Sequence, residues 1–421
     1  MARKNPVRPA RRGPSPAPGI KAALSVVARL ALVPTAFVPL LGGCGYHEGA
    51  YLGVVGPETG EWSAYGLEGV QGAQLAVKSF SKARFTSDDL RLELLHYDTG
   101  GETARLQEHF RRLATVDGAA AIIVTSPSPE EVRLAARLAD ELGIAVFFTA
   151  DAFAASSESG SPRVFNLTPE AGALVPEAVR IASAWSGGGP LALVSAQGAL
   201  YGLYRERFRR ALDDARLPYL DLELSFDAFD YASAAYRMLA DGCSGVILNG
   251  TSRDLVSLLA SCAELTYNPP FVALASAKPS RLELPEHYVL DQGYFVGGFS
   301  PQAPNAKTTA FVETFRNHIG YVPGAAAAAS YDAARIVLRG ITEADSPRAD
   351  AVARALSRIR THDGVSGAYE LERPPSSVFI ERTRPAATGI TVELVPAGPS
   401  VPEAEPEGIS PVEAGQPVKA E

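Results

Sequence analysis

The sequence of 421 residues is poor in the side chains that hold metals or form disulfide scaffolds. Its three cysteines, Cys44, Cys243 and Cys262, are too few for a disulfide-stabilised scaffold or a cysteine-rich zinc site. Six histidines are scattered along the chain, and none forms a His-Glu-x-x-His motif. We therefore expect no metal and no other cofactor.

A concentrated positive charge is also lacking. Asp and Glu number 47 against 39 for Lys and Arg, so the net charge is −8, and there is no long basic run. Nucleic-acid binding depends on basic side chains that neutralise phosphates, so we expect no nucleic-acid partner. Hydrophobic residues make up 46% of the chain, which is enough for a globular core.

Catalytic motifs are missing as well. There is no Gly-x-Ser-x-Gly nucleophile elbow. The glycines at 187–189 precede a strand, whereas a phosphate-binding loop follows a strand and opens a helix. Because no nucleophile, base and orienting residue form a set, we predict that the protein is not an enzyme.

The first 43 residues have the charge order of an export signal. Seven basic residues and no acidic residue precede an apolar run from Leu30 to Leu41. This run is shorter than the roughly 20 residues that a membrane-spanning helix needs. Residues 1–43 are therefore interpreted as a removable signal peptide, and the rest of the chain has a net charge of −15.

The segment Leu41-Gly42-Gly43-Cys44 resembles the bacterial lipobox, in which the thiol after small residues takes a lipid. This resemblance implies a mature protein that begins at Cys44 and is held by acyl chains on the periplasmic side of a bacterial membrane. The alternative is a buried cysteine that follows two glycines by chance. At the other end, residues 396–421 hold six prolines and five glutamates, and we expect this tail to be disordered.

Between residues 50 and about 300, short apolar runs alternate with amphipathic stretches, which is typical of parallel sheets covered by helices. We predict two series of strands, at 51–56, 91–97, 120–125 and 144–149, and at 191–195, 219–224, 245–248 and 271–275. Helices are predicted at 305–319, 325–341 and 349–359, and strand-like alternation returns at 377–395. The fold class is α/β, with two doubly wound, mostly parallel lobes whose crevices lie at the carboxyl ends of the strands.

One helix start is well marked in the sequence. Val132, Ala136 and Ala139 lie on one face of a helix over residues 130–142. The preceding Ser128-Pro129-Glu130-Glu131 has the pattern of a capping box with proline at the first helical position. We therefore expect the Ser128 hydroxyl to cap this helix.

Loops after the strands carry hydroxyl, aromatic and small residues. The loop from Gly56 to Gly66 leads into a helix with Gly69 and Gly72, whose small side chains let it lie close to the sheet. Residues 125–128 open another helix after the third strand. Helix amino ends favour an anion such as a carboxylate.

A family resemblance rests on the order of four motifs. They are Gly-Pro-x-x-Gly at 56–60 with Tyr65-Gly66, Tyr97-Asp98, Gly143-Ile144, and Ser-Tyr-Asp-Ala at 330–333. Over residues 50–395 the chain resembles the leucine/isoleucine/valine-binding family of type I periplasmic substrate-binding proteins. The resemblance implies a two-lobed clamp, with lobe 1 at 49–167 and 299–362 and lobe 2 at 168–298 and 363–395. Three crossings form the hinge.

This resemblance also implies ligand contacts. They fall on Tyr65, Tyr201, Ser126 or Ser128, and Thr251 or Ser252, while the position of a family threonine is occupied by Phe153. Ser126 is favoured over Ser128 because Ser128 is expected to cap a helix. Core packing is the alternative role for Tyr65, Phe153 and Tyr201.

The family's acidic residue after the strand at 271–275 is missing, since the segment is Ala275-Ser276-Ala277, and Ser276 is the ligand contact expected there. A ligand ammonium would lose a charge-assisted hydrogen bond worth roughly 1.5 to 3 kcal/mol. Asp151 is our candidate to replace it, although it can equally cap a turn.

Cys243 precedes a strand and Cys262 lies late in the following helix, which returns toward the start of that strand. A disulfide and two buried free thiols remain open alternatives.

The expected function is that of a lipid-anchored substrate-binding protein that passes a branched-chain amino acid, or a related small polar ligand, to an ABC permease and its ATPase. The alternative is a non-transport envelope lipoprotein of the same fold that senses or activates a cell-wall enzyme.

Overall fold

The computed structural model describes residues 50–80, 92–150, 159–225, 228–278, 293–386 and 389–395. The chain divides into two units, 1–46 and 47–421, and every described residue belongs to the second. Cys44, Asp151 and Phe153 lie outside the described residues, as do the predicted signal peptide and the proline-rich tail.

The first sheet, sheet A, is entirely parallel, with strand order β2-β1-β3-β4-β5. Its strands are β1 (Ala50–Gly56), β2 (Leu92–Asp98), β3 (Ala119–Val124), β4 (Ala145–Phe148) and β5 (Val164–Asn166). The first four confirm the predicted strands to within one residue at each end, whereas β5 was not predicted because three residues give no periodic signal. The strand order reverses at β1, so the crevice expected of such a sheet lies at the carboxyl ends of β1 and β3.

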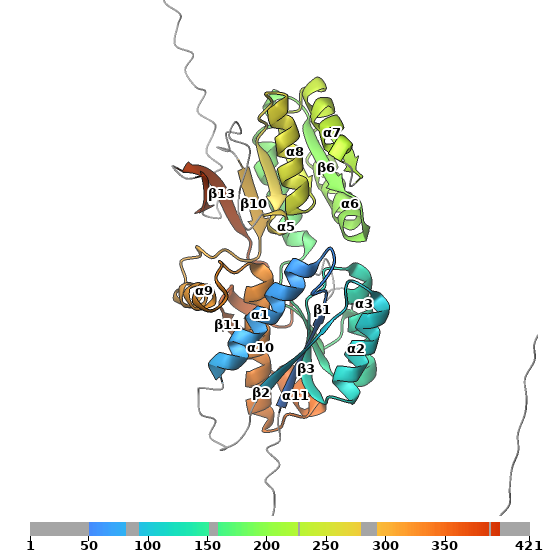
Figure 1. Cartoon of the computed structure of the whole chain (residues 1–421), viewed down its shortest axis with the longest axis vertical. Coiled ribbons are helices and arrows are strands. Elements are labelled where there is room, and N and C mark those ends of the chain that lie inside the picture. Colours follow the sequence, from blue (N-terminus) through green and yellow to red (C-terminus); the bar gives the residue numbers. More distant parts are fainter. Residues whose placement is uncertain are drawn as a thin grey trace, which may run out of the picture. The chain divides into compact units, whose positions relative to one another are not determined.

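Helices cover both faces of sheet A (Figure 1). On one face pack α1 (Ser63–Phe80), α10 (Ala325–Ala344) and α11 (Ala349–Leu356), and on the other α2 (Thr103–Thr115) and α3 (Pro129–Leu142). Two further elements complete this part of the molecule, α9 (Ala306–Ile319) and the antiparallel hairpin of β11 (Thr361–Gly364) and β12 (Gly367–Glu370). The helices predicted after residue 300 are thus confirmed, with boundaries that differ by up to three residues.

Glycines in α1 allow close packing, as predicted. A Cβ atom added at Gly72 would lie 2.1 Å from the carbonyl oxygen of Ala327 in α10. One at Gly69 would lie 2.3 Å from Cγ2 of Thr125, just after β3. Only glycine lets α1 approach both α10 and the end of the sheet this closely.

The second sheet, sheet B, has the strand order β14-β13-β10-β9-β8-β6-β7. The parallel strands are β6 (Leu191–Ala196), β7 (Tyr219–Leu224), β8 (Gly245–Asn249), β9 (Phe271–Leu274) and β10 (Gly293–Gly297). Two antiparallel strands, β13 (Phe379–Ala386) and β14 (Gly389–Val395), complete it. They confirm that the strand-like pattern at 377–395 finishes a sheet, while β10 was not predicted.

Four helices enclose sheet B. One apolar cluster joins the sheet to α5 (Ala171–Ser183) and α6 (Ala199–Asp214), and another joins it to α7 (Ala228–Ala240) and α8 (Ser252–Glu264). Short 3-10 turns, η1 (Ser186–Gly188) and η2 (Ala275–Ala277), precede β6 and follow β9.

Two of the segments that connect the sheets lie side by side. A Cβ atom at Gly298, just after β10, would lie 2.2 Å from Cδ of Pro169, just before α5. The Thr168 hydroxyl donates to the carbonyl oxygen of Ala150 at 3.1 Å. The outgoing and returning chains are therefore packed against each other.

The cysteine alternatives are decided in favour of free thiols. Cys243 and Cys262 are both free and buried in the apolar cluster beneath α7 and α8. Burial raises the pKa of Cys243 to about 11 and that of Cys262 to about 12.

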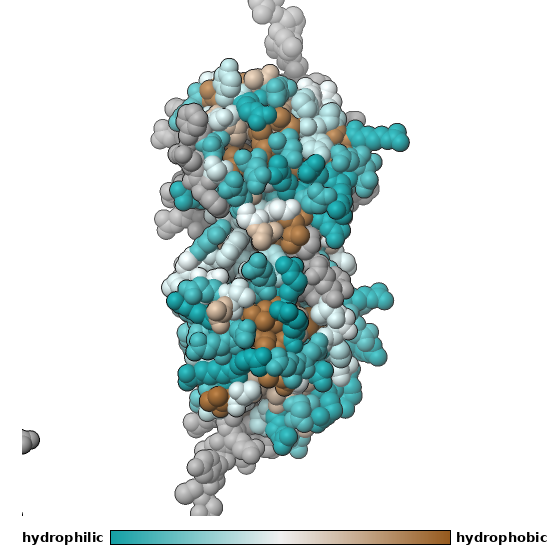
Figure 2. All heavy atoms as spheres, turned by 90° about the vertical axis from the view of Figure 1, so that its right-hand side faces the viewer, coloured by the Kyte–Doolittle hydropathy of each residue, from teal (hydrophilic) through white to brown (hydrophobic). Residues whose placement is uncertain are grey.

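Within the part of the chain that the structure describes, no helix is long and apolar enough to cross a membrane. Hydrophilic side chains cover most of the face shown in Figure 2, and apolar atoms appear there in small areas.

Candidate functional site

The loop that leads from β1 into α1 is fixed by one carboxylate. Asp98, the last residue of β2, accepts hydrogen bonds from the backbone N–H groups of Glu58 at 2.7 Å, Thr59 at 3.2 Å and Gly100 at 2.8 Å, and from the Thr59 hydroxyl at 2.7 Å. Partial burial raises the pKa of Asp98, but these hydrogen bonds outweigh it and the pKa is lowered. The Tyr97-Asp98 motif therefore positions the loop.

Three aromatic side chains, Trp62, Tyr65 and Tyr201, form what we call the aromatic group. The ring of Trp62 lies 6.1 Å from that of Tyr65 and 5.7 Å from that of Tyr201. Tyr65 is in the first turn of α1, which follows β1 of sheet A, and Tyr201 is in the first turn of α6, which follows β6 of sheet B. Two predicted ligand residues are thus brought together through Trp62, which the sequence marked only as part of the loop.

The loop after β3 corrects the predicted capping box. Ser128 does occupy the N-cap position of α3, with Pro129 after it, but its side chain makes no capping hydrogen bond. Its backbone N–H instead donates to the hydroxyl of Ser126 at 3.2 Å. In a capping box this N–H would donate to the side chain of Glu131.

The two serines differ in exposure and in their contacts. Ser126 is only 1% exposed and is engaged with the backbone, whereas Ser128 is half-buried and its hydroxyl is not used for capping. Ser128 is therefore the more exposed of the two.

The loop after β8 forms the capping box that α3 lacks. The backbone N–H and the hydroxyl of Thr251 each donate to Oδ2 of Asp254 at 2.7 Å, and the Asp254 N–H donates back to the Thr251 hydroxyl at 3.2 Å. The Tyr231 hydroxyl also donates to Asp254. Thr251 therefore caps α8.

Ser276 lies in η2, half-buried, in the segment that carries no acidic residue. Two residues later, the ammonium of Lys278 lies 2.5 Å from the buried carboxylate of Glu381. The end of β9 is therefore held by an ion pair to β13.

Glu61 is a candidate that sequence reasoning missed. Burial and the charge of Asp254 both raise the pKa of Glu61. Glu61 is exposed and directly precedes Trp62, and Asp254 belongs to α8. Adjacency to Trp62 was the available signal in the sequence.

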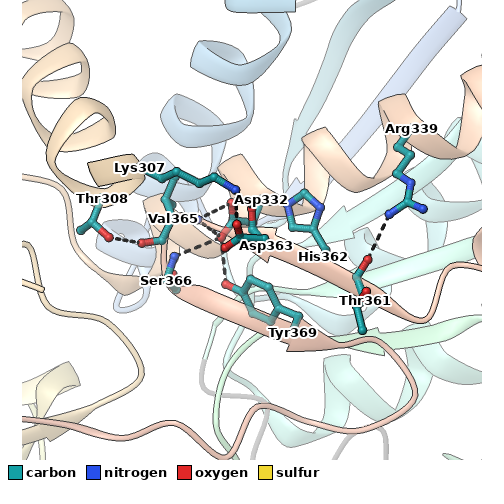
Figure 3. A network of polar contacts seen from close by, with 10 residues as sticks. All are labelled: Lys307, Thr308, Asp332, Arg339, Thr361, His362, Asp363, Val365, Ser366 and Tyr369. Atoms are coloured by element: carbon teal, nitrogen blue, oxygen red, sulfur yellow. Dashed lines mark hydrogen bonds and ion pairs between the residues drawn. The ribbon is translucent and has the colours of Figure 1, made fainter. Parts of the chain in front are cut away.

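The Ser-Tyr-Asp-Ala motif is structural. The Ser330 hydroxyl donates to that of Thr149 at 2.7 Å, just after β4. The Asp332 carboxylate accepts the N–H of Val365 at 2.9 Å and the Tyr369 hydroxyl at 3.0 Å (Figure 3). The motif thus ties α10 to the end of sheet A and to the β11–β12 hairpin.

Among the described residues, no group of three or more His, Cys, Asp or Glu side chains is arranged to hold a metal ion.

The sequence over residues 50–377 matches the family model described as periplasmic binding protein. The chain belongs to this family. Its members are substrate-binding proteins, and a periplasmic binding protein acts by holding a ligand. No curated protein matches the chain in sequence.

Solved structures of periplasmic binding proteins share the fold. LivJ, the substrate-binding protein of a branched-chain amino acid transporter from Streptococcus pneumoniae, in complex with isoleucine, has a TM-score of 0.70 at 17% identity, covering 83% of this chain and 99% of that one. The leucine-binding protein LivK from Thermotoga maritima has a TM-score of 0.66 at 18% identity, covering 82% and 98%.

A third structure carries a different ligand. The solute-binding protein of an ABC transporter from Rhodopseudomonas palustris, in complex with 3,4-dihydroxybenzoic acid, has a TM-score of 0.69 at 14% identity, covering 81% of this chain and 95% of that one. The type I fold, with two α/β lobes and mostly parallel sheets, is thereby confirmed.

Proposed function

We propose that the protein is the exported substrate-binding component of an ABC importer, lipid-anchored at Cys44 after removal of residues 1–43. It holds a small polar ligand between lobe 1, at about 49–167 and 299–362, and lobe 2, at about 168–298 and 363–395, and passes it to a permease with its ATPase. The observation that most supports this proposal is that the rings of Tyr65 and Tyr201 both contact the ring of Trp62.

The aromatic group suits a ligand-gated clamp. Its rings come from helix starts at the carboxyl ends of strands in two different sheets, where ligands of open α/β sheets bind. A ligand that contacts rings from both sheets binds the closed arrangement more tightly than an open one. Closure then follows from that difference in affinity.

The ligand class depends on a carboxylate. An amino acid needs a partner for its ammonium, whereas an aromatic acid does not, and similar folds are known with each kind of ligand. Because η2 carries no acidic residue, the candidates are Asp151, from the sequence, and Glu61, which precedes Trp62. We favour a branched-chain amino acid held by one of these two carboxylates.

Fluorescence titration tests the function. The chain has two tryptophans, Trp62 and Trp185, so the Trp185→Phe variant leaves Trp62 as the only indole reporter. Leucine, isoleucine, valine and benzoate are each titrated into this variant, expressed from its full coding sequence. One of the amino acids should change the Trp62 emission with saturation. A response to none of the four would contradict the proposal.

Calorimetry then distinguishes the two carboxylates. Loss of a charge-assisted hydrogen bond of roughly 1.5 to 3 kcal/mol weakens binding by about ten- to hundredfold. We expect one of the two variants, Asp151→Asn or Glu61→Gln, to bind the amino acid this much more weakly. The variant whose affinity is unchanged is then the matched control. Unchanged affinity in both would remove the amino acid assignment while leaving an aromatic acid open.

A further inference from the structure

A cavity of about 270 Å³ lies between the C-terminal half of α1, α9, α10 and the β11–β12 hairpin. Ser79 in its wall is 14 residues beyond Tyr65 along α1, which places it about 20 Å away at 1.5 Å per residue. The cavity is therefore separate from the aromatic group at the start of α1.

The floor of this cavity is apolar. Phe311 and Leu75 are buried in one cluster, and the ring of Tyr331 lies 4.9 Å from that of Phe311. Ala310 and Thr314 of α9 form one side. An inorganic anion would gain nothing from such a floor, whereas an apolar ring or branched chain would be desolvated against it.

The charged groups around the cavity differ in what they already contact. Lys307 lies 2.5 Å from Oδ2 of Asp363, and it also donates to the carbonyl oxygen of that residue at 2.7 Å (Figure 3). Asp332 is buried and receives the N–H groups of Val365 and Ser366 and the Tyr369 hydroxyl. Lys307 and Asp363 thus compensate each other, whereas the Asp332 carboxylate is held by hydrogen bonds from neutral groups.

Arg335, unlike Lys307, has no carboxylate partner among the described residues. Its guanidinium stands 6.0 Å from the centre of the Tyr331 ring, and no carboxylate in the described part of the chain lies within ion-pair distance of it. His362, also in the wall, has its Nε2 3.8 Å from Oδ1 of Asp332, which is beyond hydrogen-bond distance. Arg335 is therefore a cation beside an aromatic ring with no paired carboxylate among the described residues, in a cavity that the carboxylates of Asp332 and Asp363 also line.

We propose that this cavity is a second small-molecule site, which takes a small monocarboxylic acid with an apolar body. The ring or branched chain packs on Phe311 and Tyr331, and the carboxylate pairs with Arg335. The volume, slightly below the 300 to 1,000 Å³ typical of ligand pockets, suits a one-ring acid.

The neighbouring Arg339 offers a matched control. It lies one turn further along α10, pairs with Glu343 at 2.7 Å and donates to the carbonyl oxygen of Thr361 at 3.0 Å. It does not line this cavity. Arg335→Gln and Arg339→Gln thus remove the same charge from the same exposed helix face, once inside the site and once beside it.

Fluorine NMR tests the proposal with para-fluorobenzoate as the probe and the full chain labelled with fluorotryptophan. Binding should broaden the probe signal without shifting the Trp62 resonance, because no tryptophan lines the cavity. Arg335→Gln should weaken binding at least tenfold, and Ala310→Trp, at an exposed position of the wall, should abolish it. Arg339→Gln should leave the affinity within twofold.

Three results would overturn the second site. They are no probe binding, equal binding by Arg335→Gln and the unaltered chain, or binding that shifts the Trp62 resonance and survives Ala310→Trp. The last result would place the probe beside the aromatic group and would support the proposed function instead.

Discussion

The indole of Trp62 lies 5.7 Å from the phenol ring of Tyr201, which links the loop after β1 in sheet A to the first turn of α6 against sheet B. A contact between residues so far apart in the chain gives ligand binding a direct means of coupling the two lobes. It also makes Trp62 the residue whose replacement is most informative.

Replacing Trp62 by leucine should weaken binding of the transported ligand about tenfold or more. An aromatic contact is worth about 0.5 to 1.5 kcal/mol beyond its buried area, and the lost area adds to this. Calorimetry measures the affinity, with Trp185→Phe as the control because Trp185 packs against the same apolar cluster as Trp62 but its ring contacts Tyr294. Equal affinity in Trp62→Leu and the unaltered protein would show that Trp62 serves only to pack the structure.

Thr251 and Ser128 should separate stability from binding. Thr251→Val removes the cap of α8 and should lower the free energy of unfolding by about 1 kcal/mol, with unchanged ligand affinity. Ser128→Ala removes no capping bond, so it should leave stability nearly unchanged and weaken ligand binding. Urea unfolding and calorimetry on both variants check this. The opposite pattern would restore Thr251 as a ligand residue.

Glu68 should make stability depend on pH. Burial raises its pKa from 4.5 to about 7, although the N–H groups of Gly324 and Ala327, at the start of α10, lower it in part. Between these two values the folded protein binds more protons than the unfolded chain, so stability falls as the pH rises from 4.5 to 7.

Urea unfolding across this pH range measures the effect. Glu68→Gln should remove part of the decline, while Glu313→Gln, at an exposed position of α9, should keep it. An identical slope in the unaltered protein and Glu68→Gln would contradict the assignment.

Replacing Gly72 or Gly202 by alanine should have opposite effects on stability. Gly72→Ala places a methyl group 2.1 Å from the Ala327 carbonyl and should destabilise the protein by about 1 to 3 kcal/mol, because α1 and α10 must separate. Gly202→Ala, in α6 with nothing near the added atom, should stabilise it by about 0.4 to 1 kcal/mol. Melting temperatures of the two variants should therefore move in opposite directions.

Thiol counting tests the cysteines and the anchor together. Cys243 and Cys262, with pKa values of about 11 and about 12, should not react in the native protein at neutral pH. After denaturation without reductant, the exported protein should show two thiols if Cys44 carries the proposed lipid. Three thiols would contradict lipidation. A count of zero would indicate a disulfide between Cys243 and Cys262.

Local patterns in the sequence predicted the fold well because most strands of the two series are apolar or alternating runs that a helix follows. The short strand β5 and the strand β10, which begins and ends in glycine, lack that signal. The Ser-Tyr-Asp-Ala motif indicated the family, but its role in fastening the β11–β12 hairpin depends on contacts across more than 30 residues.

The candidate site was predicted only in part. Tyr65 and Tyr201 were expected from the family resemblance, but the contact of each ring with Trp62 is a tertiary contact that no local pattern records. The predicted cap by the Ser128 hydroxyl was wrong, because the Ser128 N–H donates to the Ser126 hydroxyl and the Ser128 side chain makes no capping hydrogen bond. Thr251 proved to be a cap because Asp254 stands three residues later.

Identification of the co-purifying molecule tests the central claim most directly. The exported protein is purified without added ligand and denatured, and the released small molecules are identified by mass spectrometry, in parallel with the Trp62→Leu variant. We predict a branched-chain amino acid or a related small polar molecule, bound by the unaltered protein and depleted from the variant. Release of no small molecule, or of equal amounts from both proteins, would contradict the account.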